Sequence, residues 1–317
     1  MLGFARWIVG LPLEQPAAYR RLRAIRRRIH RVVAPLSAQI VRSPEPIAFA
    51  DLDPAAFRAV RPGASLGGVF HCAWLRLTGR VPAEHPGALV MLGVRGEGLV
   101  HDRDGRILDA VSTVFQQGDL PHAGGAYREV TGVVPDADGR IELFADVTWN
   151  GWLLYAVGRG RFHGANLAVR DETAHALYYD TLALVVLAGA TEDAALAAEL
   201  RAALDASWAR FRADDLAGAR AALAPALAAP SASGFRYDAI GHGHLDMAWL
   251  WPVRETRRKA ARTYVRALNA VESREDYRYG TSQPQQMAWT RDRHPELFAR
   301  LRAAVAAGRV ELQGSFW

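Results

Sequence analysis

Residues 235–317 alternate between short apolar runs and longer amphipathic stretches, and this alternation restricts the fold more than any other feature of the sequence. The pattern predicts three strands separated by two helices, at Phe235–Gly241, Val253–Ser273, Tyr277–Ser282, Pro284–Gly308 and Val310–Trp317. A strand–helix–strand–helix–strand order implies right-handed crossovers between parallel strands. In sheets of this kind, functional side chains lie beyond the carboxyl ends of the strands.

The region from about residue 65 to 168 has a different pattern, in which short strands are separated by tight turns. Gly, Pro, Asp and Asn punctuate the turns, and the segments between them are rich in aliphatic and aromatic residues. The expected strands include Ala73–Thr78, Ala88–Val94, Arg140–Phe144 and Trp152–Val157. The pattern is typical of an antiparallel β-sandwich of the jelly-roll type.

Ala-rich helical sequence follows this β-rich region. We expect helices over about 171–188, 192–212 and 213–228, with Asp171 and Thr191 as N-caps of the first two. The Pro/Ser/Gly stretch Pro230–Gly234 then marks a domain boundary. The sequence therefore predicts four regions: a helical or irregular extension (1–64), a β-sandwich accessory domain (65–168), a helical linker (169–234) and a parallel β/α domain (235–317).

The chain is basic, with a formal net charge of +6, but its composition does not favour a nucleic-acid partner. Lys259 is the only lysine, so the positive charge is arginine spread along the chain. The one dense cluster, Arg20–Arg31, also carries apolar residues at helical spacing, which are Leu22, Ile25, Ile29 and Val32. We interpret it as an amphipathic helix whose basic face is solvated or forms a subunit contact.

Cysteine content and hydropathy bear on the cellular compartment. Cys72 is the only cysteine, so neither an intrachain disulfide nor a cysteine-based zinc site can form. The N-terminal sequence has no clear cleavage site, and no run approaches the roughly 20 apolar residues of a membrane helix. We expect a cytoplasmic protein without a membrane partner.

The segment Arg236–Thr256 carries the residues most suited to chemistry. His242, His244 and Asp246 alternate directly after the first predicted strand of the β/α domain, and residues two apart in an extended chain point to the same side. Imidazole and carboxylate groups together suit a divalent ion such as Zn²⁺, although hydrogen-bonded caps of the strand would give the same pattern. Trp249 and Trp251 follow, and an aromatic ring can stack on the apolar face of a sugar.

The stretch Gly241–Thr256 (GHGHLDMAWLWPVRET) resembles the entry motif of the glycoside hydrolase family 38 α-mannosidases. Gly280–Gln285 (GTSQPQ) and Gly308–Trp317 (GRVELQGSFW) resemble the second and third strands of that family's catalytic domain. The sequences WLRLTGRVP and DVTWNG in the β-rich region resemble the N-terminal sandwich of its bacterial and fungal vacuolar branch. The resemblance implies a multidomain protein with a jelly-roll-like sandwich, a helical linker and the first βαβαβ part of a seven-stranded β/α barrel.

The resemblance also implies zinc-dependent hydrolysis of terminal α-D-mannosyl residues from oligosaccharides, with retention of configuration. By motif position, His244 and Asp246 are expected to ligate one zinc ion, and Trp249 to form the floor of the sugar site. The family's zinc holds sugar hydroxyls, while two carboxyl groups act as nucleophile and general acid. A homo-oligomer is expected for the full-length form.

One departure from the family bears on activity. The family's nucleophile, general acid and remaining zinc ligand lie beyond the position that corresponds to Trp317. Asp276, Asp292 and His294 fall in a loop and a helix, not at the family's positions. We therefore expect that this stretch of chain is a fragment or truncated product without mannosidase activity by itself.

Two other functions fit parts of the sequence. Amidohydrolases also place His-x-His after a first barrel strand, so another metal-dependent hydrolase is one alternative. The second is a carbohydrate-binding or assembly fragment without catalysis, with Trp74, Trp149 and Trp152 as a sugar platform in the sandwich. Tryptophans in a sandwich are more often core residues.

Overall fold

A computed structural model describes residues 16–112, 127–151, 158–229 and 234–314. The chain divides into two compact units. The first contains the described residues 16–33, 168–229 and 234–236, and we call it the helical unit. The second contains the described residues 34–112, 127–151, 158–167 and 237–314, so it combines the β-sandwich with the C-terminal β/α domain.

The helical unit packs four helices around one apolar cluster. Its members are α2 (Pro16–Ile29), α3 (Glu172–Ala190), α4 (Ala194–Arg212) and α5 (Leu216–Ala228). Three of the four apolar residues expected on the inner face of the basic helix, Leu22, Ile25 and Ile29, are buried in this cluster. The fourth, Val32, lies beyond the helix end and is exposed.

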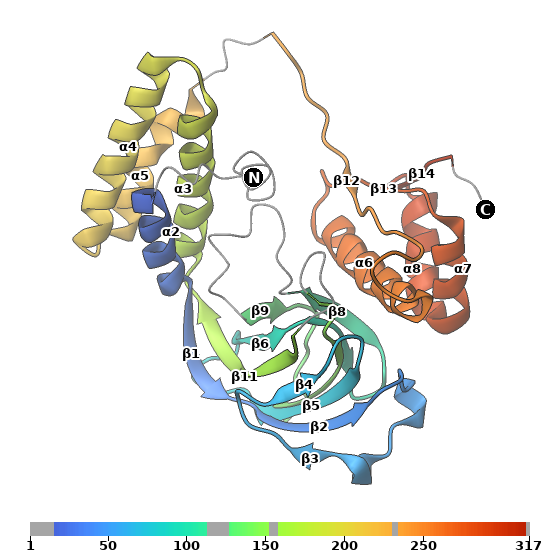
Figure 1. Cartoon of the computed structure of the whole chain (residues 1–317). Helices are drawn as coiled ribbons and strands as arrows, with labels where there is room; N and C mark the ends of the chain where they lie inside the picture. Colours follow the sequence, from blue (N-terminus) through green and yellow to red (C-terminus); the bar gives the residue numbers. More distant parts are fainter. Residues whose placement is uncertain (1–15, 113–126, 152–157, 230–233, 315–317) are drawn as a thin grey trace. The chain divides into compact units, whose positions relative to one another are not determined.

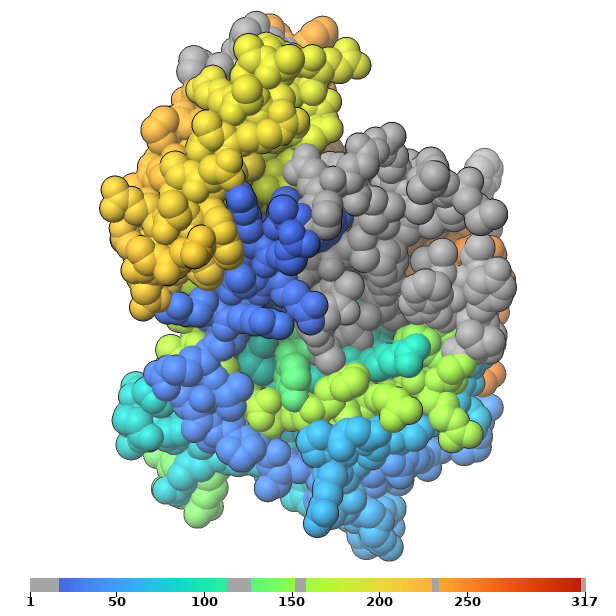
Figure 2. Space-filling model, turned by 60° about the vertical axis from the view of Figure 1, so that its left-hand side comes forward, coloured from blue at the N-terminus to red at the C-terminus, as the bar shows by residue number. Residues whose placement is uncertain are grey.

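The basic face of α2 is paired within the unit. Arg21 lies 2.6 Å from Asp205 of α4, and Arg28 lies 2.7 Å from Asp214, just after α4. In the space-filling view the blue residues of α2 lie directly against the yellow helices (Figure 2). Two arginines of the cluster thus have intramolecular partners.

The caps of these helices agree only partly with expectation. Asp171 caps α3 by accepting from the Ala174 N–H, as predicted. Thr191, predicted as the N-cap of the following helix, instead ends α3. Asp193 caps α4, because its carboxylate reaches the N–H groups of the first turn, while the Thr191 hydroxyl only accepts from the Asp193 N–H.

The sandwich consists of two sheets. The six-stranded sheet has the order β3-β2-β5-β10-β7-β8, and the five-stranded sheet has the order β1-β11-β6-β9, with β4 paired to β11. The bounds are β1 (His30–Pro35), β2 (Ser37–Ser43), β3 (Arg58–Ala59), β4 (Ser65–Gly67), β5 (Cys72–Arg80), β6 (Leu89–Arg95), β7 (Glu97–Asp102), β8 (Ile107–Ser112), β9 (Tyr127–Val130), β10 (Arg140–Thr148) and β11 (Gly160–Arg170).

Three of the predicted sandwich strands are present as β5, β6 and β10, and the fourth, Trp152–Val157, lies outside the described residues. The predicted extension 1–64 is divided differently. Its described helix, α2, belongs to the helical unit, and β1, β2 and β3 belong to the sheets of the sandwich. The alternation of Leu36, Ala38 and Ile40 has the two-residue period of a strand, and β2 pairs with β5 along its whole length.

The C-terminal domain forms a three-stranded parallel sheet, as predicted (Figure 1). Its strands are β12 (Gly241–His242), β13 (Tyr279–Thr281) and β14 (Val310–Leu312), and the intervening helices are α6 (Val253–Ser273), α7 (Pro284–Arg293) and α8 (Pro295–Ala306). In the described part of the chain, no helix is long and apolar enough to cross a bilayer.

The first strand of this sheet is shorter than the sequence predicts. Phe235–Gly241 was expected to be a buried strand, but only Gly241 and His242 pair with β13. Phe235, Tyr237 and Ile240 have exposed fractions of 81%, 86% and 57%. The apolar pattern indicates a tendency to be buried, but burial requires packing partners that local sequence does not supply.

The predicted helix Pro284–Gly308 is two helices. Pro295 has no backbone N–H to continue the α-helical bonding, and its ring disfavours the α conformation of the preceding residue. His294 accordingly has φ −139° and ψ 65°, which ends α7 before α8 begins. Gly308, predicted as the helix terminator, follows α8 with φ +65°.

Helix α6 is buried on two sides. Ala261, Val265 and Leu268 belong to an apolar cluster that also contains Tyr279 and Val310 of the parallel sheet. The same cluster extends into the sandwich through two further residues, Leu99 of β7 and Ala110 of β8. The outer face of the six-stranded sheet is therefore covered by a helix of the C-terminal domain.

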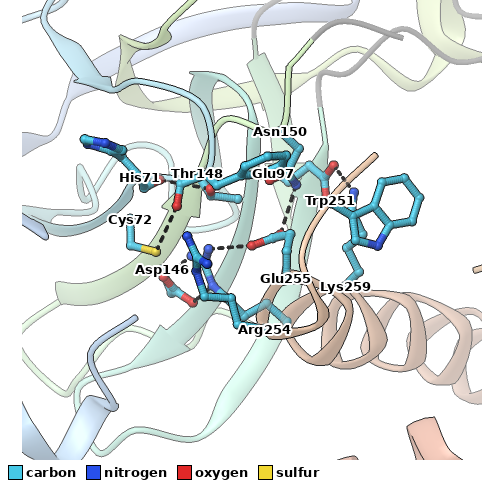
Figure 3. Close-up of polar contacts among 12 residues, drawn as sticks. His71, Cys72, Glu97, Asp146, Thr148, Asn150, Trp251, Arg254, Glu255 and Lys259 are labelled. Carbon is cyan, nitrogen blue, oxygen red and sulfur yellow. Dashed lines mark hydrogen bonds and ion pairs between the residues drawn. The ribbon is translucent and has the colours of Figure 1, made fainter. Parts of the chain in front are cut away.

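Charged side chains of that sheet face are paired with charged side chains of α6. Glu97 lies on the same face of β7 as Leu99, and Asp146 of β10 stands opposite Leu99 in the register. Figure 3 shows Glu97, Asp146 and Glu255 in the space between sheet and helix. We call the six residues Glu97, Asp146, Glu255, Arg258, Lys259 and Arg262 the buried ion network.

The buried ion network contains three carboxylates and three cations in mutual contact. Arg258 donates to both oxygens of Asp146, at 3.0 and 2.5 Å, and to Glu255 at 2.8 Å. Arg262 donates to Glu97 at 2.9 Å and to Glu255 at 2.6 Å. Lys259 lies 2.5 Å from Glu97. Because each charge has an opposite partner at hydrogen-bond distance, the network compensates the desolvation that burial imposes.

The pKa values show which effect dominates. Burial alone would raise the pKa of Glu97, but Lys259 and Arg262 outweigh it and lower that pKa to about 2. Burial likewise opposes the charge of Arg258, and Asp146 and Glu255 nevertheless raise its pKa. Both groups are therefore ionised at neutral pH.

We predict that Glu97→Gln destabilises the second unit by about 3 kcal/mol or more at pH 7, because buried Lys259 loses its carboxylate partner and Arg262 loses one of its two. The depressed pKa of Glu97 stabilises the fold above its unfolded pKa of about 4.3, and this contribution disappears as pH falls toward 2. The difference in the free energy of unfolding between Glu97→Gln and wild type, measured by urea unfolding, should therefore become smaller below about pH 4.

Glu142→Gln is the matched control for this experiment. Glu142 of β10 pairs with Arg76 at 2.6 Å, but both side chains are about one-third exposed. Such a pair contributes up to about 1 kcal/mol. Two outcomes would contradict the assigned role of the network. One is an equal loss of unfolding free energy in the two variants. The other is a loss in Glu97→Gln that stays constant from pH 7 to pH 3.

Candidate functional site

The predicted metal pair lies in the loop between β12 and α6, beyond the carboxyl end of the first parallel strand. We call residues 243–252 the motif loop. His244 Nε2 and Asp246 Oδ1 are 3.2 Å apart. The side chain of His244 is 79% exposed and that of Asp246 is 39% exposed. The structure thus brings the two predicted ligands together at the surface.

His242 does not join this pair. Its Nδ1 lies 2.9 Å from the carbonyl oxygen of Gly280, the residue that it faces in β13. This hydrogen bond joins neighbouring strands, so the capping interpretation holds for His242. His244 and Asp246 are the two predicted ligands that the structure places in contact.

The motif loop begins at a glycine in a crowded position. A Cβ on Gly243 would lie 2.7 Å from the hydroxyl of Tyr279 and 2.8 Å from the side chain of Thr263. Such distances are too short for a side chain. The backbone at this point therefore packs closely against β13 and α6, which fixes where the loop leaves the strand.

Two buried side chains hold the backbone on either side of Asp246. Gln286 Nε2 of α7 donates to the Leu245 carbonyl at 2.7 Å, and Thr256 Oγ1 of α6 donates to the Met247 carbonyl at 2.5 Å. Both side chains are buried, as is Leu245 itself. The carboxylate therefore lies on a stretch of backbone anchored to two helices.

The two tryptophans of the motif loop differ in exposure and contacts. Trp249 is 56% exposed, and its ring meets that of Trp251 edge-to-face at 5.5 Å. Trp251 donates from Nε1 to the Thr256 hydroxyl at 3.1 Å, and the Lys259 ammonium lies 4.7 Å from its ring centre. Figure 3 shows Trp251 beside Lys259. Trp251 is the supported ring, and Trp249 is available to a ligand.

Arg254 and Glu255 open α6, and they have different partners in the structure. Arg254 lies 3.3 Å from Glu45, whereas Glu255 is buried in the ion network and also accepts from Asn150 at 2.9 Å. Sequence reasoning did not identify Thr256 or Gln286. Thr256 lies four residues before Ala260 and eight before Tyr264, both buried, and this spacing could have placed its hydroxyl on the inner face of α6.

Two of the three tryptophans proposed as a sugar platform in the sandwich are core residues. Trp74 and Trp149 are both buried, and Trp74 donates from Nε1 to the Ile47 carbonyl at 3.0 Å. Trp152 lies outside the described residues. Cys72 is also buried, and burial raises the pKa of its thiol to about 11, which disfavours a nucleophilic role.

The other ionisable residues considered in the C-terminal domain have local roles. Asp276 lies 3.7 Å from Arg274, and Asp292 lies 2.8 Å from Arg291. His294 stands between α7 and α8, where burial first and then the charges of His101 and Arg293 lower its pKa to about 4. It is neutral at physiological pH and lies apart from the metal pair.

A cleft of about 1150 Å³ lies away from the motif loop, between β8 and helices α6 and α8. Arginines are prominent in its lining, but four of them have carboxylate partners in or beside it. Arg266 pairs with buried Asp109, and Arg300 pairs with Glu272 at 2.7 Å. No residue of the motif loop lines this cleft, and four of its arginines form ion pairs within the protein. The cleft is therefore distinct from the candidate site.

The metal pair fits part of a zinc site. Ligands in a tetrahedral zinc site lie about 3.3 Å apart, given metal–ligand bonds of about 2.0–2.1 Å, and the imidazole nitrogen and carboxylate oxygen here are 3.2 Å apart. Among the described residues, no group of three or more His, Cys, Asp or Glu side chains could hold a metal ion. The described residues therefore contribute two donors of suitable chemistry and spacing.

Two regions of the chain match family models. Residues 235–317 match the glycosyl hydrolases family 38 N-terminal domain. Residues 33–126 match the α-mannosidase jelly roll domain. The first region contains the motif loop and the whole parallel sheet, and the second begins at β1 and extends through β8.

Similar proteins are α-mannosidases. Alpha-mannosidase 2C1 of Homo sapiens is 29% identical over 297 residues, which are 87% of this chain and 27% of that protein. Alpha-mannosidase 2C1 of Mus musculus is 40% identical over 79 residues, 25% of this chain and 8% of that protein. Alpha-mannosidase G of Dictyostelium discoideum is 32% identical over 87 residues, 27% of this chain and 8% of that protein.

The chain thus spans about a quarter of the length of its human relative, and the similarity covers most of the chain. The jelly-roll match agrees with the two-sheet sandwich, and the C-terminal match agrees with the parallel sheet that carries the metal pair. In both matched domains the chain is therefore similar to the N-terminal portion of the family 38 α-mannosidases, a family of glycosidases.

Proposed function

We propose that the chain contributes the metal- and sugar-binding part of a zinc-dependent retaining α-mannosidase that removes terminal α-D-mannosyl residues from oligosaccharides. The observation that carries the proposal is the pairing of His244 with Asp246, 3.2 Å apart at the end of a parallel strand. Exposed Trp249 lies three residues further along the same loop. Similarity to the family 38 α-mannosidases supports the mannoside as the substrate class.

The parallel sheet supports a barrel as the wider architecture. Strands β12, β13 and β14 with their helices have the βαβαβ connectivity of the beginning of a β/α barrel. Barrel enzymes collect side chains from the carboxyl ends of several strands. We infer that the motif loop is one contribution to a site that further barrel strands would complete.

Within this proposal the residues have distinct tasks. His244 and Asp246 would hold the metal, and a bound zinc ion supplies a Lewis acid that orients and polarises sugar hydroxyls. Trp249 would bind the apolar face of the mannosyl ring through its exposed surface. Gln286 and Thr256 keep Asp246 in place through the flanking carbonyls. A retaining glycosidase also needs two carboxyl groups about 5–5.5 Å apart, as nucleophile and general acid.

We propose that these 317 residues do not turn over mannosides by themselves. Two metal donors support weaker zinc binding than a complete set of four, and neither Asp276 nor Asp292 lies beside the metal pair. A cytoplasmic location and a homo-oligomeric state of the complete protein remain predictions from the sequence and the family resemblance.

The contacts of His242 bear on the alternative of a His-x-His metal hydrolase. In that alternative both histidines would face the metal, but among the described residues His242 forms no three-donor group with His244 and Asp246. The matched domains favour the mannosidase.

We predict that the chain binds one zinc ion in isothermal titration, and that His244→Ala and Asp246→Asn each weaken binding by at least tenfold. Each substitution removes one of two donors, so the remaining one cannot chelate the ion. His85→Ala in a sandwich turn is the control, because it removes an imidazole remote from the motif loop. Binding that survives both motif substitutions would place the metal elsewhere.

We also predict that Trp249→Ala weakens binding of methyl α-mannoside roughly three- to tenfold in the presence of zinc, since a ring contact contributes about 0.5–1.5 kcal/mol. Trp208→Ala in the helical unit is the matched control, because that ring stacks on Phe211 instead. Isothermal titration measures both variants. An equal effect of the two substitutions would remove Trp249 from the proposed sugar site.

Turnover is tested separately with a chromogenic α-mannoside and added zinc. We expect no release of the chromophore above background, because the described residues supply no nucleophile and acid beside the metal pair. Turnover that disappears in Asp246→Asn would show that this chain contains a complete catalytic site.

A further inference from the structure

The hydroxyl of Thr256 lies at a junction between the two parts of the motif loop. It donates to the Met247 carbonyl at 2.5 Å and accepts from Trp251 Nε1 at 3.1 Å. Thr256 is fully buried in the first turn of α6. A threonine hydroxyl has one proton to donate, so this side chain uses its donor on one segment of the loop and an acceptor lone pair on another.

The first of these bonds restrains the metal pair. Met247 directly follows Asp246, and the Leu245 carbonyl on the other side is held by Gln286 at 2.7 Å. With the peptide group before Asp246 and the one after Met247 both held, the backbone that carries the Asp246 carboxylate has limited freedom. Partners outside the ligand set that orient a ligand commonly change metal affinity by about 10- to 100-fold when they are removed.

The second bond restrains the tryptophan pair. Trp251 is fixed at its indole nitrogen by Thr256 and at its ring face by Lys259. The Trp249 ring rests edge-to-face against Trp251 at 5.5 Å. The orientation of the exposed ring therefore depends on the same hydroxyl that restrains Asp246.

The position of Thr256 is in turn set by its neighbours in the ion network. Glu255 and Arg258 flank it in α6, and Arg258 is bonded to Asp146 of the sandwich through two nitrogens. The first turn of α6 is thereby attached to β10. The hydroxyl is fixed relative to a rigid sheet as well as to its own helix.

We propose that Thr256 is a positioning residue that couples the metal pair to the tryptophan pair, so that metal binding and sugar binding change together when its hydroxyl is removed. The coupling rests on the proposed function of the motif loop, but the restraint on the loop itself does not. The two can therefore be tested separately.

The test compares Thr256→Val, which keeps the shape and loses both hydrogen bonds, with Thr256→Ser, which keeps the hydroxyl. We expect Thr256→Val to raise the dissociation constant for zinc about tenfold or more. The dissociation constant for methyl α-mannoside should rise in the same variant. Thr256→Ser should stay near wild type for both ligands. Amide hydrogen exchange without metal should become faster in residues 244–251 of Thr256→Val only.

Thr148→Val is the matched control. The Thr148 hydroxyl is also fully buried and donates to a backbone carbonyl, that of His71, at 2.9 Å, but it does not touch the motif loop. Urea unfolding shows whether each variant is folded and how much stability it loses. If Thr256→Val does not fold, Thr256→Ala replaces it, because the smaller side chain also lacks the hydroxyl without adding volume.

The outcomes separate the inference from the proposed function. If the wild-type chain binds no zinc, the proposed metal site fails, and hydrogen exchange of the metal-free chain still decides whether Thr256 restrains the loop. Unchanged exchange in Thr256→Val, equal acceleration in Thr148→Val, or failure of serine to restore slow exchange would each overturn the inference. A loss of zinc affinity in Thr256→Val with an unchanged affinity for methyl α-mannoside would overturn the coupling.

Discussion

The second unit depends on the pairing of opposite charges between the outer face of the six-stranded sheet and helix α6. Three carboxylates and three cations are buried there, and each has an opposite charge within hydrogen-bond distance. Burial of any one alone would be strongly unfavourable. The network joins Glu97 and Asp146 of the sandwich to Glu255, Arg258, Lys259 and Arg262, and it therefore attaches the helix to the sheet through six charged side chains. The apolar contacts of Leu99 and Ala110 with α6 add burial to this charge complementarity.

The first turn of α6 connects the buried ion network to the motif loop. Thr256 follows Glu255 of the network directly, and its hydroxyl holds both the Met247 carbonyl and Trp251. Lys259 connects Glu97 of the sandwich with the face of Trp251. The accessory sandwich is thus in contact with the elements that orient the candidate ligands. In a glycosidase this arrangement would make the sandwich a support for the sugar site as well as a separate domain.

Sequence patterns failed where local preference and tertiary context disagree. The apolar run Phe235–Gly241 has strand composition, yet only its last residue pairs with a neighbouring strand. The stretch Pro284–Gly308 has continuous helical periodicity, but Pro295 divides it because its nitrogen carries no hydrogen. Residues 30–59 have few long apolar runs, and their short strands became recognisable only through pairing with β5 and β11. The first two errors concern the bounds of an element and the third concerns strands that were missed, whereas the parallel order of the last three strands was predicted correctly.

The sequence by itself determined the β-rich region, the helices and the parallel β/α domain, since hydrophobic period and turn residues are local properties. It also determined the candidate metal pair, because alternation places His244 and Asp246 on one side of an extended segment. Only the tertiary structure decided that His242 turns to Gly280 and that Thr256 and Gln286 hold the loop. The ion network likewise joins residues more than 100 positions apart, such as Asp146 and Arg258. An alternating strand or helix pattern shows which side chains share a face, but it contains no information about which other element covers that face.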